Sequence, residues 1–251
     1  MSRKTYSWVN SVSAEVPLEE VELLVFVLDG SGSMDYNDTY DKRSRAEHLC
    51  ELLRATLERL ARSSRRSAYR VNFVYFSDGV YVEEVGGRKY FTLDEALQLL
   101  KNPVQVAGGR STWIAGGLRK ALEIIEEFER DESLPERKKV TVFLFTDGAE
   151  NVEGKDAVRR YANEIKAHRL APILATVSFG TEQETDKDLL KSIASEASDR
   201  QKRHLKIAGV ISHLTDPNRL FIDGHVGGEI TKQKAEALRN FVYVLSATRK
   251  E

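Results

Sequence analysis

The stretch Leu24–Asp35, LVFVLDGSGSMD, joins an apolar segment to a turn rich in oxygen-bearing side chains. The apolar and β-branched residues of Val21–Leu28 predict a strand that is buried on both faces of a sheet. This segment ends abruptly in DGSGS, residues 29–33, whose two glycines allow a sharp turn and a close approach of the backbone to a ligand. The stretch therefore predicts a buried strand that delivers polar side chains to the edge of a sheet.

Three oxygen-bearing side chains alternate in this turn. Asp29, Ser31 and Ser33 can converge on one point above the end of the strand. One carboxylate and two hydroxyls form a set of hard oxygen donors, which suits magnesium, manganese or calcium better than zinc. The simpler alternative is a turn in which the same side chains bond only to nearby backbone groups.

Composition and length narrow the possible classes of protein. The 251 residues suffice for one large α/β domain or at most two small ones, and the net charge of −1 argues against a nucleic-acid-binding role. The single cysteine, Cys50, excludes an intrachain disulfide. Residues 1–16 lack the apolar core of a signal peptide, and no apolar run approaches the roughly 20 residues of a membrane span. We therefore expect a cytoplasmic protein that does not associate with membranes.

Strand and helix patterns alternate along the chain. We expect strands at 21–28, 69–76, 80–85, 140–145, 172–178 and 220–222. We expect helices at about 44–61, from 92, from 114, and at 156–168, 186–197 and 231–245, while 204–214 fits a helix or a strand. This alternation predicts an α/β fold with a doubly wound, mostly parallel six-stranded sheet, helices on both faces and one antiparallel edge strand. We expect residues 1–20 to form a lead-in and 21–251 to form one domain.

Two further elements extend the DGSGS motif. Thr112 follows the Gly108-Gly109 loop and precedes a helix, and Thr146-Asp147-Gly148 follows the strand predicted at 140–145. Together the three elements resemble the metal-ion-dependent adhesion site of von Willebrand factor A domains, which begins with D-x-S-x-S. Arg110 and Ser111 separate the glycines from Thr112, so either Ser111 or Thr112 could supply the hydroxyl that faces the metal.

The resemblance implies the fold of that family and a set of metal ligands. The implied ligands are Asp29, Ser31, Ser33, Thr112 and Asp147, holding magnesium first and manganese or calcium as alternatives. Family topology places the strands that precede the two acids side by side, at the point where strand order reverses and ligands bind. Two acids meeting there would repel each other without a cation, which would raise the pKa of one of them. The resemblance also implies that a water at rest, or the Asp or Glu of a partner protein when bound, completes the shell.

These features favour a binding module over an enzyme. We expect a metal-dependent protein–protein interaction module that captures an acidic side chain, similar to intracellular bacterial A-domain proteins of tellurium-resistance, stress and defence systems. The alternative is a subunit that works with an AAA+ ATPase, as in magnesium chelatase. A metal-dependent phosphatase is a weaker alternative, because LDGSG has Ser31 where the haloacid-dehalogenase phosphatases need a second Asp. The chain has neither a dinucleotide-binding glycine fingerprint nor a P-loop.

Other polar residues near these motifs receive simpler interpretations. Asp35, Asp38 and Asp41 could widen a metal-binding rim, but we expect them to lie in a solvated loop. The spacing of the five histidines does not indicate metal ligands. Glu150 could tune the site or lie on the surface, and Trp113 could be a contact residue at the site or pack beneath the loop.

Overall fold

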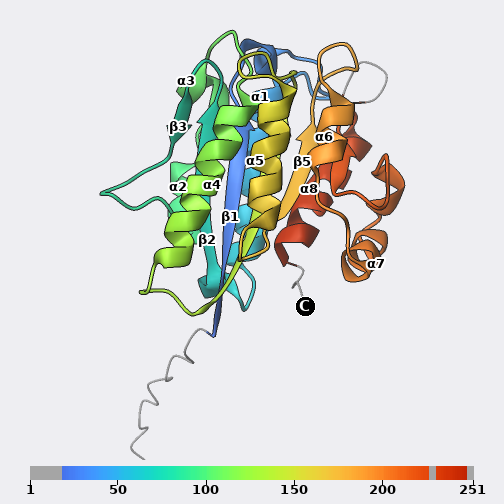
Figure 1. Cartoon of the computed structure of the whole chain (residues 1–251). Coiled ribbons are helices and arrows are strands. Elements are labelled where there is room, and N and C mark those ends of the chain that lie inside the picture. The colour runs from blue at the N-terminus through green and yellow to red at the C-terminus, as the bar shows by residue number, and fades with distance from the viewer. Residues whose placement is uncertain (1–18, 226–229, 248–251) are drawn as a thin grey trace, which may run out of the picture.

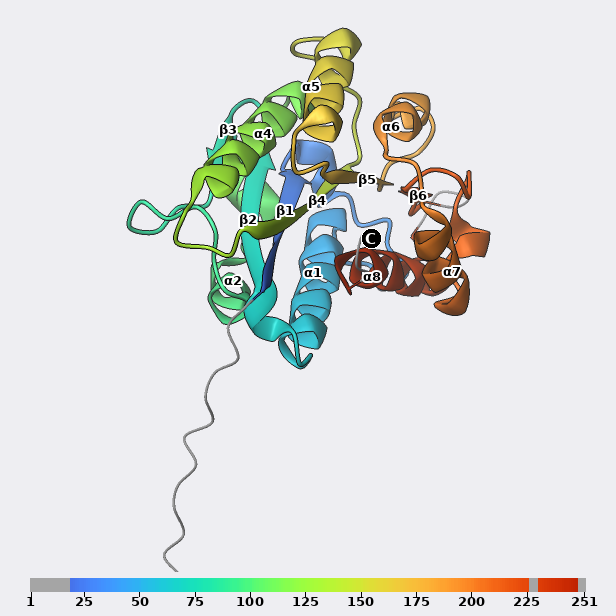
Figure 2. The same ribbon diagram turned by 60° about the horizontal axis from the view of Figure 1, so that its bottom comes forward.

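The structure is a computed structural model that describes residues 19–225 and 230–247. Most of the predicted lead-in, residues 1–18, lies outside the described residues. The described chain is a central sheet between two layers of helices (Figures 1 and 2). No helix among the described residues is both long and apolar enough to cross a bilayer.

The sheet has six strands in the order β3-β2-β1-β4-β5-β6. Its strands are β1 (Glu20–Asp29), β2 (Tyr69–Phe76), β3 (Val80–Val82), β4 (Arg137–Thr146), β5 (Ile173–Ser178) and β6 (Phe221–Asp223). Only the pairing of β2 with β3 is antiparallel among these strands. The observed sheet confirms the predicted fold class, including the antiparallel edge strand.

Helices cover both faces of the sheet. They are α1 (Arg45–Ala61), α2 (Leu93–Leu99), α3 (Pro103–Ala107), α4 (Ile114–Arg130), α5 (Lys155–Ala167), α6 (Lys187–Ile193), α7 (Asp199–Ile207) and α8 (Lys232–Ala247). Helices α4, α5 and α6 pack on one face, and α1, α7 and α8 lie on the other (Figure 2). This arrangement is the doubly wound one that alternating strands and helices predict.

The alternating side chains of β1 explain why both faces need a helical cover. Leu24 and Phe26 face the layer that contains α1 and α8, whereas Val25 and Val27 face the layer that contains α4 and α5. The ring of Phe26 lies 5.4 Å from that of Phe143, measured between centroids. Burying an apolar side chain of this size contributes about 1.5–3 kcal/mol, so β1 belongs to the most stable part of the sheet.

Strand order reverses at β1, and this reversal creates the candidate site. The chain passes from β1 through α1 to β2 on one side, and later enters β4 on the other side of β1. Leu28 pairs with Phe145 in the β1–β4 register, so the two strands end at the same edge of the sheet. Asp29 and Asp147 therefore follow neighbouring strands at the point predicted from the family topology.

Several local predictions differ from the structure in their boundaries. Strand β3 ends at Val82 rather than at residue 85, and β4 begins at Arg137 rather than at 140. The short helix α3 was not predicted; Asn102 caps it, and Pro103 occupies its first turn. The ambiguous segment 204–214 contains the end of α7 and a 3-10 turn, and it contains no strand of the sheet.

Glu22 is a buried acid inside the predicted apolar strand. Its side chain receives one hydrogen bond of 3.3 Å, from the hydroxyl of Thr141, while its Oε2 has no partner. Burial raises the pKa of Glu22 to about 8, although the charges of Arg65 and Lys139 oppose the shift. Both bases pair with Glu20 instead. Glu22 is therefore held in its neutral form over a pH range in which an unfolded chain would ionise it.

We predict that Glu22→Gln removes a pH-dependent loss of stability. The folded protein retains a proton that the unfolded chain loses above pH 4.5, so the free energy of unfolding falls as pH rises toward 8 and then levels off. The slope from this one group is at most about 1.4 kcal/mol per pH unit. Urea unfolding between pH 5 and 9 should show that the free energy of unfolding of E22Q increases relative to that of the wild type as the pH rises. Glu19→Gln is the control, and an unchanged difference between wild type and E22Q across this range would contradict the prediction.

Candidate metal centre

The turn after β1 is packed tightly against two other segments. The backbone N–H of Gly30 donates to the carbonyl of Phe76, and that of Gly32 donates to the carbonyl of Gly109 at 2.9 Å. A Cβ added to Gly30 would lie 2.4 Å from the carbonyl oxygen of Pro103, so no larger residue fits without movement. These contacts bring the glycine loop before α4 beside the DGSGS turn.

Asp29 is completely buried at the end of β1. Its Oδ1 accepts a hydrogen bond from the backbone N–H of Ser31 at 2.8 Å, and its Oδ2 accepts one from the hydroxyl of Thr146 at 2.5 Å. Burial and the nearby charge of Asp147 raise the pKa of Asp29 to about 7. No cation contacts Asp29 in the described part of the chain, so its negative charge would be poorly compensated there.

Asp147 collects the two serine hydroxyls of the motif. Its Oδ1 accepts from Ser33 Oγ at 2.7 Å and, more weakly, from Ser31 Oγ at 3.4 Å. Burial raises the pKa of Asp147, while the Ser33 bond and the guanidinium of Arg45 counteract that rise. The structure thus brings Asp29, Ser31, Ser33 and Asp147 together, as the resemblance implied.

Ser111 and Thr112 face different neighbours. The backbone N–H of Ser111 donates to Asp78 Oδ1 at 2.7 Å, and the Ser111 hydroxyl also bonds to Asp78. The hydroxyl of Thr112 instead lies against Gly148, because a Cβ added there would be 2.6 Å from Thr112 Oγ1. Thr112 is therefore the hydroxyl on the side of Asp147, the residue that precedes Gly148.

Arg45 is a central residue of this region that sequence reasoning missed. It is 1% exposed, and its guanidinium contacts Asp147 at 2.8 Å, Asp38 at 2.5 Å and Glu184 at 3.1 Å. It stands at the first position of α1, after the Ser44 capping box, where a positive charge is unfavourable for the helix dipole. That unusual placement was the one available sequence signal that Arg45 has an acidic partner.

Several interpretations of nearby residues need correction. Asp38 is not a solvated loop residue, because it bonds to Arg45 and to His225 Nε2 at 3.1 Å. Glu150 is buried and accepts the backbone N–H of Ala115, so it holds the start of α4. Trp113 both packs and reaches outward, because its ring lies against Gly116 while its indole N–H donates to Glu153.

The donor set fits a hard divalent cation. Two buried carboxylates and three hydroxyls meet at one end of the sheet, and all of their donor atoms are oxygens. The guanidinium of Arg45 donates to Oδ2 of Asp147, the carboxylate oxygen that the serines do not contact. Asp29 accepts hydrogen bonds from neutral donors only. A divalent ion would offset the charge that burial otherwise disfavours.

The family profile of the von Willebrand factor type A domain matches residues 24–215. The chain belongs to this family. Its match includes every residue of the predicted metal set, from Asp29 to Asp147. No curated protein sequence matches this VWA chain significantly.

Solved structures of low sequence identity share the fold. Proximal thread matrix protein 1 from the mussel byssus is 17% identical with a TM-score of 0.60, over 89% of this chain and 47% of its own. A von Willebrand factor type A protein from Catenulispora acidiphila is 17% identical with a TM-score of 0.59, over 89% and 42%. Manganese-loaded TRAP protein from Plasmodium vivax is 19% identical with a TM-score of 0.53, over 88% and 72%. This chain thus spans less than half the length of the mussel and Catenulispora proteins.

We predict that Arg45→Met strongly destabilises the VWA fold. Removing the guanidinium leaves the carboxylate of Asp147 buried and unpaired, a change that typically costs about 3–5 kcal/mol. The measurement is urea unfolding at pH 7 in a chelating buffer. Arg54→Met, on the exposed side of the same helix, is the control and should change stability by no more than about 0.5 kcal/mol. Equal effects of the two substitutions would contradict a central role for Arg45.

Proposed function

We propose that this VWA domain binds a divalent cation and uses it to capture an acidic side chain of a protein partner. The proposed ligands are Asp29, Ser31, Ser33, Thr112 and Asp147, with magnesium as the first candidate and manganese or calcium as alternatives. The observation that supports this most is the convergence of Ser31 and Ser33 on Asp147, beside the buried Asp29. The domain would act as an interaction module and not as an enzyme.

The chemistry of the ligands explains why a bound cation would attract an acid. Three of the five proposed ligands are neutral hydroxyls, so the ion would retain positive character toward an incoming carboxylate. The serine hydroxyls donate their protons to Asp147, which leaves their lone pairs free to face a cation. Five side chains leave a six-coordinate ion with at least one open position. A partner's Asp or Glu is the natural occupant of that position.

Two related structures support metal binding by this fold. The mussel protein has also been solved with a zinc-occupied MIDAS motif, and the Plasmodium protein was solved loaded with manganese. Each of these observations concerns that protein, at 20% and 19% identity to this chain. They support a divalent ion here, while the all-oxygen donor set is the reason to place magnesium first.

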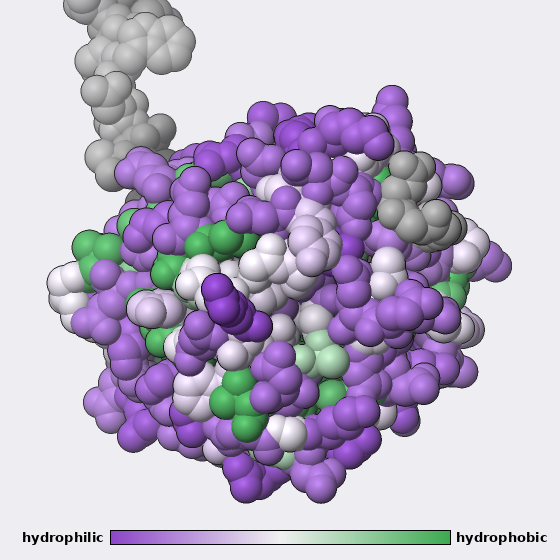
Figure 3. Space-filling view, turned by 90° about the horizontal axis from the view of Figure 1, so that it is seen from above, coloured by the Kyte–Doolittle hydropathy of each residue, from purple (hydrophilic) through white to green (hydrophobic). Residues whose placement is uncertain are grey.

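The surroundings of the site suggest what the partner carries besides its acid. The end of the molecule that bears the site is largely hydrophilic (Figure 3). A groove of about 530 Å³ is lined by Ala149, Lys155 and residues 182–188, and Thr185 in its lining donates a hydrogen bond to the backbone carbonyl of Asp147. The lining has four acids, Glu182, Glu184, Asp186 and Asp188, against two bases, Lys155 and Lys187. We therefore propose that basic residues flank the partner's carboxylate.

The cellular setting rests on the sequence resemblance alone. We propose a cytoplasmic bacterial protein of a stress-response or defence system. Catalysis is not proposed, because Ser31 occupies the position where a haloacid-dehalogenase-type reaction needs its general acid, and its hydroxyl is directed toward Asp147.

We predict that Thr112→Val weakens divalent-metal binding whereas Ser111→Ala does not. The Thr112 hydroxyl lies next to Gly148 at the site, and the Ser111 hydroxyl is bound to Asp78. Titration calorimetry with manganese should show that T112V binds the ion at least about tenfold more weakly than the wild type. A tenfold loss for S111A with none for T112V would reassign the third hydroxyl.

We predict that the protein selects acidic peptides only when metal is present. A displayed random-peptide library should yield binders in magnesium that chelator releases and that Asp29→Ala fails to retain. Each selected peptide should lose binding when its Asp or Glu is changed to Asn or Gln, because the amide cannot neutralise the ion. Enriched peptides that survive chelation or the amide substitution would contradict acid capture.

A further inference from the structure

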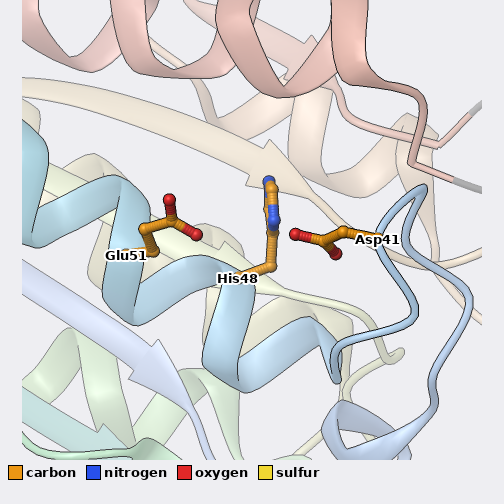
Figure 4. A group of neighbouring side chains, drawn as sticks. All are labelled: Asp41, His48 and Glu51. Atoms are coloured by element: carbon orange, nitrogen blue, oxygen red, sulfur yellow. The ribbon is translucent and has the colours of Figure 1, made fainter.

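A second cluster of possible metal ligands lies outside the residues of the first site. Asp41 comes from the loop before α1, and His48 and Glu51 lie one turn apart on α1. One donor atom from each of the three lies within 4.8 Å of the other two. Figure 4 shows the carboxylates of Asp41 and Glu51 pointing toward the imidazole from opposite sides. The histidine spacing in the sequence did not indicate this cluster, because its acids come from a loop and from the next helical turn.

The imidazole of His48 has an unused donor atom in this cluster. His48 is 3% exposed, and its Nδ1 is buried without a hydrogen-bond partner. An imidazole nitrogen that is buried near two carboxylates without a hydrogen-bond partner is costly as it stands, and it is available to bind a metal ion.

Arg43 is the cation that now neutralises the two acids. Its guanidinium bonds to Asp41, with Nε at 2.7 Å from Oδ2, and it also contacts Glu51. The Arg43 side chain is 44% exposed, so it can leave toward solvent without opening the core. Asp41 is held in place independently, because its Oδ1 accepts the hydroxyl of Thr39 at 2.8 Å.

We propose that Asp41, His48 and Glu51 form a second divalent-metal site, selective for zinc or a similar transition ion. One imidazole nitrogen and two carboxylates are ligands that zinc accepts, with bonds of about 2.0–2.2 Å. Tetrahedral bonds of that length place donor atoms about 3.3–3.6 Å apart, and the three donor atoms here lie within 4.8 Å of one another, so they must approach by at most about 1.5 Å. The side chain of Glu51 is flexible and partly exposed, so it can move toward the ion. Arg43 can leave the cluster toward solvent and make room for that movement.

A metal here would tie the loop before α1 to the body of the helix. Asp38 belongs to the same loop and holds Arg45, which in turn holds Asp147. A metal at the second site would therefore hold the loop that carries Asp38, and through Arg45 it would stabilise the position of Asp147 in the first site. The proposal does not rest on the proposed function, because none of its ligands belongs to the set around Asp29.

Cobalt substitution tests the second site with the full chain. Cobalt(II) bound by a nitrogen and carboxylates gives visible absorption, and the proposal expects one such ion per chain even in an Asp29→Ala variant. Glu51→Gln, at a partly exposed position, should weaken cobalt and zinc binding by at least about tenfold, as should His48→Gln. His204→Gln, an exposed histidine of α7, is the matched control and should bind like the wild type.

Arg43→Met separates a metal site from a simple ion-pair cluster. Loss of the competing guanidinium should tighten zinc binding several-fold if the three residues are ligands. Cobalt absorption that is absent from both the wild type and R43M would overturn the proposal. Absorption that persists unchanged in E51Q and H48Q but disappears in D29A would place the ion at the first site instead, and would likewise overturn it.

Discussion

The meeting of two buried carboxylates at the end of two adjacent strands is the constraint around which this structure is arranged. Asp29 and Asp147 follow β1 and β4, which pair in parallel at the centre of the sheet. Neither acid reaches solvent, and burial raises the pKa of both. Hydrogen-bond donors around the two acids offset part of this cost. The backbone N–H of Ser31 and the hydroxyl of Thr146 donate to Asp29, and the hydroxyl of Ser33 and the guanidinium of Arg45 donate to Asp147.

The unequal compensation of the two acids gives the region its chemical character. Asp147 has a permanent positive partner in Arg45, which Asp38 and Glu184 hold from the other side. Asp29 has only neutral hydrogen-bond donors. A divalent cation would therefore be held mainly by its attraction to Asp29 and by the hydroxyls, and it would keep enough charge to bind an external carboxylate.

Helix α1 links the two metal sites proposed for this chain. Its first residue is Arg45, which contacts Asp147, and its next turn carries His48 and Glu51. The preceding loop supplies Asp38 to the first network and Asp41 to the second cluster. The two clusters differ in chemistry, because the first offers only oxygens and the second offers an imidazole nitrogen. A single short loop thus positions groups in two places that suit different ions.

The sequence by itself determined the six strands, six of the eight described α-helices and the three motif segments, because these depend on local periodicity, turn residues and spacing. Asp29 and Asp147 could be placed together in advance because the family resemblance implies that their two strands are neighbours, and parallel strands end at one edge of the sheet. Only the tertiary structure decided that Thr112 rather than Ser111 faces Gly148, because that choice depends on the contact of Ser111 with Asp78, 33 residues away. The same holds for Arg45, whose acidic partners lie in loops, and for the cluster around His48, which needs Asp41 from the loop before α1. Burial is the physical reason in each case, since a polar or charged group excluded from water must find its partner in space and not along the chain.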